Sequence, residues 1–499
     1  MADRETLQHA GEFNLTGPNI ISSSGNQVNI QNILLELNVF QDLDSPYMSG
    51  NILINDSSGL YEFLPLIGQE RLVFNLKTPN SGASVDFENY QAVIYNVEKR
   101  FNTTDRSQGY LLNWTTLDNY RNFRTKVSRA FRSDISTMVM QILSEELGSR
   151  KPVFVDPTMN PRSFVIPNMT PYQACNFLKE EAISQEQKSP HYLFYENPMG
   201  YHFRSLDSLL GSQGSTVVQH KKTYKSQPPD DPKEIEGATG TILAFSLEDS
   251  SNTFSNGRAG MYGSTMFYHD VFNKTLQKYE YDYLAHCYSK RQQLNQDSGK
   301  FGPMVSESPV DGKKRITDFP SSKIFVHPTS GKELHHEGTS GVPNYPYTNN
   351  NAPIWLQESR SRELEREYFT LQIETYGDTD IMVGDIIDVI IPANRGVLDK
   401  SGGKSSMDNV LSGRYLVYKL HHQISPQSQA HKMTLHVMKD SVQVALPQED
   451  ITFPEELQGL QSIASATGEI GKQITFKPRK ISLPSLKFPK PKFPTISWP

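Results

Sequence analysis

Apolar and polar residues alternate with a period of two along Leu411–Asp440, which reads LSGRYLVYKLHHQISPQSQAHKMTLHVMKD. The alternation stops at Pro426–Gln429, whose residues are typical of a turn, and then resumes. This pattern predicts a β-hairpin. Its apolar positions are Leu416, Tyr418, Leu420, Met433, Leu435 and Val437.

A similar pattern occurs earlier in the chain, at Val93–Thr115. A shift of 323 positions (418 minus 95) superposes the two stretches without a gap, and the matched pairs are Tyr95 and Tyr418, Val97 and Leu420, Phe101 and Ile424, Leu112 and Leu435, and Trp114 and Val437. The same apolar face is expected in both. Chance would also give two hairpins with similar alternation. A second match, of IGQERLVFNL from Ile67 with VGDIIDVII from Val383, favours duplication of a β-rich unit.

Strand patterns surround both hairpins. Between Ile20 and Asn119 five or six strands with short connections are expected, which favours a closed or nearly closed antiparallel barrel or sandwich. The second unit is expected to contain the strands Thr241–Leu247, Phe369–Thr375, Asp385–Ile391, Arg414–Ile424 and Lys432–Lys439.

The period changes to that of a helix after Arg132. The stretch SDISTMVMQILSEELG predicts a helix with Ser133 as its N-cap and Gly148 after its end. A second helix is predicted from the capping box at Thr170–Gln173, and the stretch HYLFYEN with its continuation YHFRSL predicts a hairpin. Together these elements indicate a small ααββ domain between the two β units.

Three further segments complete the predicted organisation. Residues 211–236 are polar and proline-rich, as in a linker, and a hairpin is indicated within Ser264–Tyr283. Residues 296–353 are rich in Gly, Pro, Asn and Ser and predict a long exposed loop. Leu356–Tyr368 carries so many charges that a solvated surface helix is expected.

Composition and charge narrow the class of protein. The chain has 499 residues and a formal charge of -6, which argues against bulk nucleic-acid binding. Its two cysteines, Cys175 and Cys287, suit folding in a reducing cytoplasm. No stretch has the length or apolarity of a membrane span or a secretory signal. From Lys472 onward seven Lys or Arg and no acid stand among prolines, so an extended segment that docks on a partner is the preferred interpretation.

Candidate chemistry is sparse. The stretch LDKSGGKS at Leu398–Ser405 lacks the first glycine of a phosphate-binding loop and is interpreted as a hairpin loop. The pairs His335-His336 and His421-His422 place neighbouring rings on opposite faces of a strand, so one metal cannot bind both. We therefore predict no catalytic, cofactor-binding or metal-binding residues. Paired carboxylates for glycan hydrolysis are not revealed by spacing alone and leave that alternative open.

The blocks YENPMGYHFRSLDSL at Tyr195–Leu209 and IMVGDIIDVIIP with LSGRYLVYKLHHQIS from Ile381, in the order barrel, ααββ insert, barrel, resemble the central baseplate hub proteins of contractile-tailed bacteriophages. The resemblance implies a homotrimer whose six tail-tube-like barrels form a pseudo-sixfold ring. It implies as partners the tail tube protein or a tube-initiating baseplate protein, and a trimeric cell-puncturing spike. DNA would pass through the lumen without sequence-specific binding, in a virion tail baseplate assembled in the host cytoplasm.

The expected fold is mainly β (α+β), with two tail-tube-like antiparallel β-barrel domains and an inserted ααββ domain. The expected parts are an N-terminal arm (1–19), a first barrel (20–130), the insert (131–210), a linker (211–236), a second barrel with the long loop 296–353 (237–446) and an extended Pro/Lys-rich tail (447–499). Neighbouring baseplate proteins are expected to contact Lys472–Pro499. The alternative is a phage-tail-associated cell-wall glycan hydrolase or a carbohydrate-binding protein.

Overall fold

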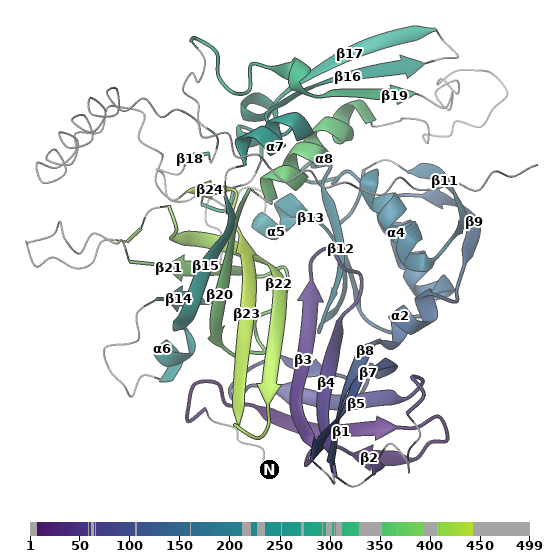
Figure 1. The fold of residues 1–499 in the computed structure, drawn as a ribbon. Coiled ribbons are helices and arrows are strands. Elements are labelled where there is room, and N and C mark those ends of the chain that lie inside the picture. The colour runs from purple at the N-terminus through teal and green to yellow at the C-terminus, as the bar shows by residue number, and fades with distance from the viewer. Residues whose placement is uncertain are drawn as a thin grey trace, which may run out of the picture. The chain divides into compact units, whose positions relative to one another are not determined.

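Two groups of strands lie side by side in the structure, a computed structural model that describes residues 7–442 (Figure 1). The residues within this range that it leaves out are 58, 61–63, 65, 105–106, 160, 212–220, 227–234, 251, 271–273, 292, 296–301, 304, 306–311, 329–351, 367, 393–406 and 409. The tail and the stretch 398–405 therefore lie outside the described residues, as does the pair His335-His336.

The first group of strands comes from the N-terminal part of the chain. Its inward residues form one core around Trp114, on which Phe74 and Phe87 pack edge to face. Outward positions of β4 are half-buried, which gives the alternation that a half-buried strand requires. The strands are β1 (Asn14–Ile21), β2 (Gln27–Asn29), β3 (Leu34–Asp42), β4 (Ser49–Asp56), β5 (Arg71–Lys77), β6 (Ser84–Asp86), β7 (Ala92–Thr104) and β8 (Ser107–Thr116).

The second group has its own core, built around Tyr224, Tyr415, Leu420 and Leu435. A single bridge between Lys225 and Thr241 brings β14 to the start of β15, so this group is nearly closed into a barrel. Its strands are β14 (Thr223–Lys225), β15 (Ile242–Ser250), β20 (Phe369–Tyr376), β21 (Ile386–Ile390), β22 (Gly413–Ser425) and β23 (Ala430–Met438). The predicted fold class, mainly β with large antiparallel sheets, is confirmed.

Five strands of each group are arranged in the same order. The pairing order is β3-β4-β8-β7-β5 in the first group and β15-β20-β23-β22-β21 in the second, and each series follows the same succession along the chain. We call these two sets the first repeat and the second repeat. A shared strand order in both space and sequence is difficult to obtain by chance, and it supports duplication.

The register of the two hairpins agrees up to Glu98 and its counterpart His421, and beyond them β7 has two further bulges that β22 lacks. The pair Val97 and Leu112 in β7 and β8 corresponds to Leu420 and Leu435 in β22 and β23, again 323 positions apart (420 minus 97). Both ladders contain a β-bulge at the same place, at Tyr95 between Ile94 and Asn96 and at Tyr418 between Val417 and Lys419. Because a bulge sets local twist and bend, the two hairpins curve at equivalent positions.

The turn before β5 and β21 is built alike in both repeats. A carboxylate accepts a backbone N–H from three residues earlier, Ile67 to Glu70 Oε1 and Met382 to Asp385 Oδ2, each at 2.8 Å. A glycine with positive φ lies in each turn, one residue later in the second: Gly68 (83°) directly follows the donor Ile67, whereas Gly384 (93°) directly precedes the acceptor Asp385. The Gly-plus-polar pattern in the sequence therefore marks a specific turn, and its prediction ahead of both strands is confirmed.

The expectation of one shared apolar face is wrong at two positions. Tyr95 and Phe101 are 53% and 47% exposed, whereas Ile424, the counterpart of Phe101, is fully buried. The bulge explains Tyr95, because the extra residue interrupts the alternation of faces. Phe101 follows a further bulge that β22 lacks, and a strand covers β22 at Ile424.

An inserted group of elements between the repeats has its own core of apolar and aromatic side chains. The two predicted helices and the hairpin are confirmed, and strands β9 to β11 add to them. The predicted N-cap Ser133 is wrong, because Asp134 caps the helix by accepting the N–H of Thr137 at 2.9 Å. The elements are α2 (Leu117–Asn122), β9 (Val127–Ser133), α3 (Ile135–Gln141), the π-helical turn η1 (Ile142–Glu146), β10 (Val153–Val155), β11 (Arg162–Met169), α4 (Pro171–Glu180), β12 (Tyr192–Asn197), β13 (Gly200–Ser205) and α5 (Leu206–Leu210).

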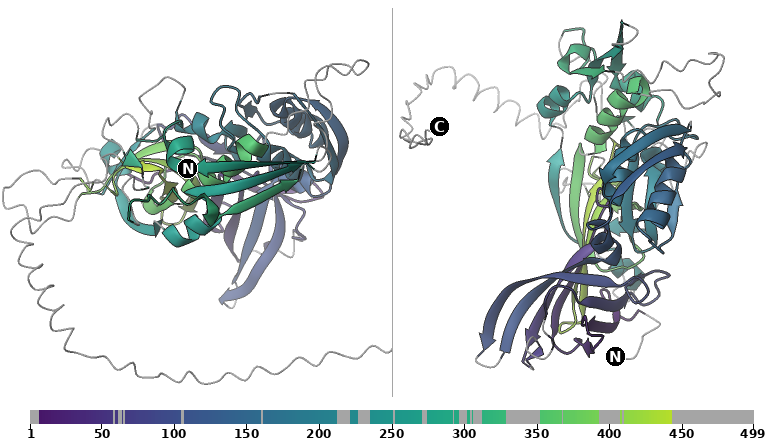
Figure 2. Two further views of the ribbon diagram at one scale, coloured as in Figure 1. Left: turned by 90° about the horizontal axis from the view of Figure 1, so that it is seen from above. Right: turned by 90° about the vertical axis from the view of Figure 1, so that its right-hand side faces the viewer.

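The remaining elements lie between β14 and β20 in the chain, apart from β24. The predicted hairpin becomes β16 and β17, which form a separate sheet with β19 (Figure 2). Strand β19 lies within 296–353, so the expectation of a loop throughout is wrong for that part. The elements are α6 (Ile235–Thr239), α7 (Thr253–Ala259), β16 (Gly263–Asp270), β17 (Thr275–Asp282), η2 (Leu284–Tyr288), β18 (Gly302–Pro303), η4 (Pro320–Ser322), β19 (Ile324–Pro328), α8 (Ala352–Arg366) and β24 (Ser441–Val442).

Candidate functional site

The two repeats are joined edge to edge by β22 of the second repeat and β3 of the first (Figures 1 and 2). Six antiparallel residue pairs span the contact, from Lys419 opposite Asp42 to Ile424 opposite Leu37. We call this ladder and the side chains around it the seam. Ile424 belongs to the core of the first repeat, so the second repeat completes the first.

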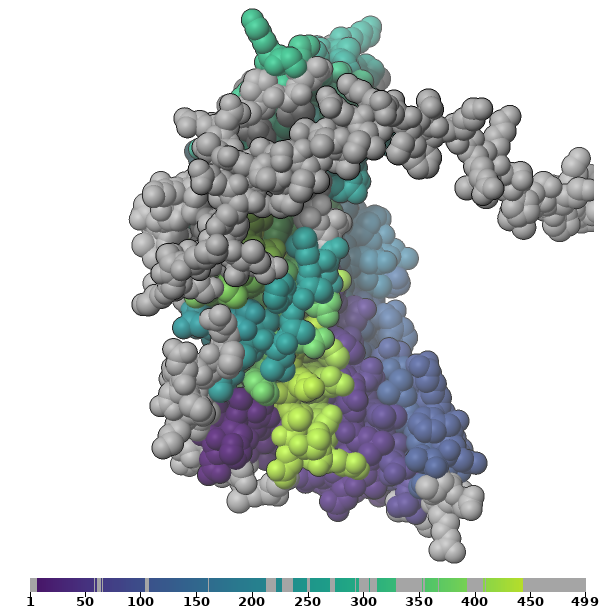
Figure 3. All heavy atoms as spheres, turned by 60° about the vertical axis from the view of Figure 1, so that its left-hand side comes forward, coloured from purple at the N-terminus to yellow at the C-terminus, as the bar shows by residue number. Residues whose placement is uncertain are grey.

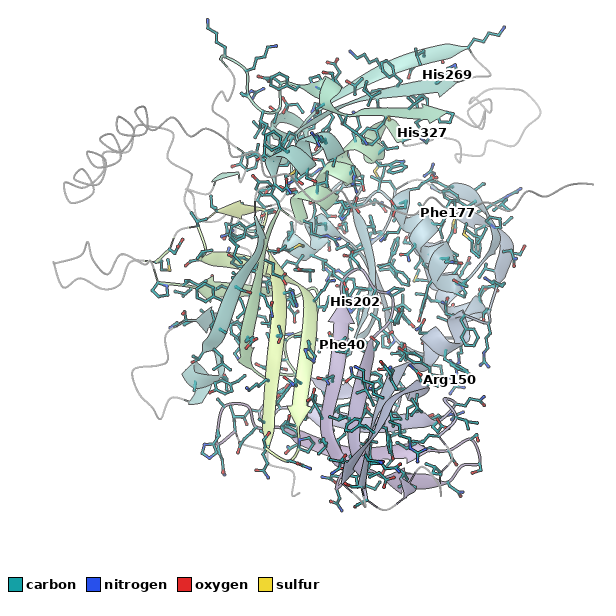
Figure 4. All side chains as sticks on the ribbon, viewed as in Figure 1. Phe40, Arg150, Phe177, His202, His269 and His327 are labelled. Carbon is teal, nitrogen blue, oxygen red and sulfur yellow. The ribbon has the colours of Figure 1, made fainter. Side chains whose placement is uncertain are left out.

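One side of the seam is formed by His421. Its Nε2 lies 2.7 Å from Asn38 Oδ1, and its ring stacks on Phe40 with 4.6 Å between the centroids. Figure 4 labels Phe40 on β3 beside the strands of the second repeat. Asn38 also donates to Asn51 Oδ1 at 2.8 Å, which extends the hydrogen bonds across β4. This side of the seam is therefore polar and partly exposed.

The other side of the seam is formed by His422 and is completely buried. The N–H of Val383 donates to Gln41 Oε1 at 3.3 Å, so the amide nitrogen of Gln41 faces His422 Nε2 at 3.4 Å. An amide nitrogen can only donate, so His422 Nε2 accepts. The proton of neutral His422 is then on Nδ1, which donates to His431 Nε2 at 3.1 Å.

The two buried histidines are held in their neutral form. Burial lowers the pKa of His431 from 6.5 to about 3. Burial, followed by the neighbouring His431, holds the pKa of His422 well below its ordinary value. The prediction that His421 and His422 lie on opposite faces is confirmed, and both serve the contact between the repeats.

A second contact joins the repeats at the far end of β5 and β20. The N–H of Thr78 donates to Thr379 Oγ1 and the N–H of Thr379 donates to Thr78 Oγ1, both at 3.0 Å. Beside this reciprocal pair, Asp380 Oδ1 accepts from Ser81 Oγ at 2.7 Å and from the N–H of Ala83 at 2.9 Å. Hydrogen bonds rather than apolar packing therefore fix the two repeats here.

A buried charged cluster on α8 is the other candidate for chemistry. Arg362 is fully buried and bonds Asp207 at 2.5 Å and Glu365 at 2.6 Å, while Arg291 pairs with Glu358. The expectation of a solvated helix is therefore wrong. Buried charges require partners, and here α5 and the neighbouring elements supply them.

Two groups next to this cluster have pKa values close to neutrality. Burial, and then the nearby Glu365, raises the pKa of Asp440 to about 7, and burial lowers that of Lys439 to about 7. Such values are typical of acid–base catalysts. The cavity that they line with Arg362 has a volume of about 10 Å³, which is room for a single water. Because this cavity has no room for a larger molecule, we interpret the cluster as a contact that joins the insert, α8 and the second repeat.

Both cysteines are buried free thiols, and burial raises the pKa of each. The interpretation of Cys175 as a buried helix residue is confirmed. Among the described residues, no three His, Cys, Asp or Glu side chains are grouped as metal ligands. None of the described helices is long and apolar enough to cross a membrane.

Sequence reasoning missed the polar residues of the seam. Asn38 and Gln41 face β22 from within the strand LLELNVFQD, and Thr379 follows β20. Polar side chains that interrupt an apolar strand indicate a polar contact, because buried polar groups almost always have hydrogen-bond partners. Their partners are about 300 to 380 residues away, and spacing in the sequence does not identify them.

The described residues thus form a β-rich protein whose buried polar groups join its own repeats and insert. No family model matches the chain. The chain is 23% identical over 434 residues to a probable baseplate hub protein, gp334 of Vibrio phage KVP40, and the match covers 83% of this chain and 91% of that protein. The resemblance to baseplate hub proteins predicted from the sequence is confirmed.

Solved structures of tail proteins are also similar to this chain. A tail protein from Neisseria meningitidis MC58 matches with a TM-score of 0.49 and 11% identity over 86% of this chain and 97% of that one. The 43 kDa tail protein of prophage MuSo2 from Shewanella oneidensis matches with a TM-score of 0.44 and 9% identity over 86% of this chain and 99% of that one.

Proposed function

We propose that the chain is the structural hub of a contractile phage tail baseplate, and that three copies form a pseudo-sixfold ring. The seam carries this proposal, because it fixes two equivalent five-stranded repeats next to each other within one chain. Three such chains contribute six similar repeats, which suits a sixfold partner on one side and a threefold partner on the other. The similarity to a hub protein supports the same role.

The partners in this proposal are a sixfold tail tube, or the baseplate protein that starts it, and a trimeric spike. DNA passes through the ring without sequence-specific contacts, and assembly in the host cytoplasm places the hub in the virion tail. The basic tail, Lys472–Pro499, docks on neighbouring baseplate proteins through its prolines and apolar residues. The role is structural, and we assign no catalytic, cofactor-binding or metal-binding residues.

The ring is tested by native mass spectrometry and electron microscopy of the purified full chain. Three chains of 56.5 kDa give a particle of 169.5 kDa (3 times 56.5), with threefold images that show six similar lobes. Monomer at every concentration, also with tube or spike protein present, would contradict the hub proposal. Sustained glycan hydrolysis by the pure protein, abolished by one carboxylate substitution, would contradict its structural character.

The role of the basic tail has a separate test. Deletion of Lys472–Pro499 should leave the ring intact and lower its incorporation into tails, measured by the yield of complete tails in a complementation assay. A matched chain in which the same segment keeps its prolines and loses its seven basic residues separates charge from backbone conformation. Unchanged tail assembly with both chains would show that the segment does not dock.

A further inference from the structure

Strand β15 has an outer edge that no other described strand pairs beyond Thr241. It is the counterpart of β3, and both strands carry a β-bulge at the same place against their inner neighbour, at Leu35 in β3 and at Leu243 in β15, 208 positions apart (243 minus 35). In β3 the outer edge pairs with β22 across the seam. A second bulge in β15, between Leu247 and Asp249, has no counterpart in β3, so the two edges are equivalent over Ile242–Leu247.

The side chains on β15 are more exposed than their counterparts on β3, which a neighbouring strand covers. Leu37 and Val39 of β3 are buried in the core of the first repeat, while their counterparts Phe245 and Leu247 are 42% and 46% exposed. Figure 3 shows this part of the surface, with uncovered teal atoms at the edge of the second repeat. An edge strand with exposed apolar side chains is open to pairing with another chain.

Strand β7 supplies the complementary edge. Its counterpart β22 uses Lys419–Ile424 for the seam, and the stretch of β7 at the same shift, Asn96–Phe101, is largely exposed. Unlike β22, β7 has a second bulge in this stretch, between Glu98 and Phe101. Strand β5 pairs with β7 at Val93 and Ala92, before this stretch begins. Phe101 follows this second bulge and pairs with Gly109, so it is not the register equivalent of Ile424, but its half-exposed ring is an apolar side chain beside the same edge.

We infer that β15 of one copy pairs in antiparallel fashion with β7 of the next copy, and repeats the seam between molecules. The inference rests on the proposed ring and identifies the surface that closes it. Within one chain β15 and β7 do not pair, and seven pairings separate them in the sheet order. The contact is therefore head-to-tail, and a head-to-tail contact with a closing rotation generates a ring.

Charge substitutions on each edge test the pairing in the full-length protein. The Phe245→Lys/Leu247→Lys double variant and the Phe101→Lys variant should each lower the association constant by roughly tenfold or more, measured by analytical ultracentrifugation, because an unpaired charge enters the contact. All three residues are about half exposed, so the folded monomer and its melting temperature should change little. Val165→Lys on β11, at a residue 70% exposed, is the matched control and should assemble like the parent chain.

Mixing the two edge variants gives a sharper result. Each retains one intact edge, so a mixture should form a one-to-one dimer with no larger species, while either variant alone remains monomeric. Hydrogen exchange should show protection of residues 243–247 and 96–101 in the assembled parent chain. Ring formation by each edge variant alone would overturn the pairing and leave the hub proposal intact. The same would follow if both edges of the assembled parent chain exchanged as fast as in the monomer. A parent chain that never assembles overturns both.

Discussion

Gly377 lies directly against the ring of His431 where β20 ends. A Cβ atom at this glycine would be 2.0 Å from His431 Cγ, which no rotation of a buried ring can relieve. The N–H of Gly377 also donates to the carbonyl of His431 at 2.8 Å, so the backbone cannot move away without losing a hydrogen bond. Glycine is required here by space, since its φ is not positive.

Gly377→Ala should destabilise the protein by about 2 kcal/mol or more, because overpacking in a buried contact displaces the histidine pair. Urea unfolding followed by fluorescence measures the change. Gly82→Ala is the matched control, because its Cβ would meet Asp380 Oδ1 at an ordinary 3.8 Å. Equal stability of the two variants would contradict this account of Gly377.

The buried histidines make stability depend on pH. Their pKa values are lowered on folding, to about 3 for His431, so the unfolded chain binds protons near pH 6.5 that the folded seam cannot accept. Stability is therefore complete above about pH 6.5 and falls on acidification, by roughly 1.4 kcal/mol per pH unit for each histidine.

Melting temperatures between pH 7 and 4.5 should show this loss in the parent chain, and His431→Gln should reduce it, because the glutamine carbonyl still accepts from His422 Nδ1 without titrating. His269→Gln, at an exposed residue of β16, is the control and should follow the parent chain (Figure 4). The same acid loss in His431→Gln as in the parent chain would exclude the histidine pair as its cause.

Helix α8 is the element whose environment differed most from its prediction. Its sequence from Glu358 onward is rich in charges, and a solvated helix was the natural interpretation, yet Arg362 and Glu365 are buried. Periodicity reports where apolar side chains lie and does not distinguish a charge in water from a charge paired inside the protein. The hairpins were predicted correctly, because their alternation and turns are local properties.

Arg362→Ala should destabilise the protein by about 3–5 kcal/mol, because it leaves Asp207 and Glu365 as buried carboxylates without their cation. Two positions earlier on the same helix, Arg360 pairs with Glu363 at the surface. Arg360→Ala should cost less than about 1 kcal/mol. Thermal and urea unfolding of both variants measures the difference, and similar losses would contradict a structural role for the buried cluster.

At the scale of the whole molecule, the seam and the contact at Thr379 make one unit of two repeats. Thr379→Val keeps the shape of the side chain but leaves the N–H of Thr78 without its acceptor and the carbonyl of Ala83 without its donor, which should cost about 1–3 kcal/mol. Thr434→Val on β23 is the control, at a residue partly exposed.

Unfolding followed separately by core tryptophan fluorescence and by exchange of β23 amides shows whether the repeats still unfold together. Two separated transitions in Thr379→Val would show that this contact couples the repeats. A single transition with unchanged stability would contradict the coupling.

Duplication could be predicted from the sequence because a gapless shift of 323 positions preserved the alternation of both hairpins. The strand order and the shared bulge then gave that shift a structural meaning. The junction could not be predicted in the same way, because the residues that join β3 to β22 are polar, few and far apart in the chain. Long-range pairing depends on the folded arrangement, and the sequence shows no period for it.

The seam also has a consequence for synthesis of the chain. Gln41 and His422 are separated by 381 positions, so at roughly 5–20 residues per second the ribosome completes β22 about 20–80 seconds after β3. During that interval the edge of β3 is unpaired. Strand β22 of another nascent chain is chemically as good a partner for it as the chain's own β22. Copies of this chain translated close together on one messenger would then risk exchanging strands before their own second repeat emerges.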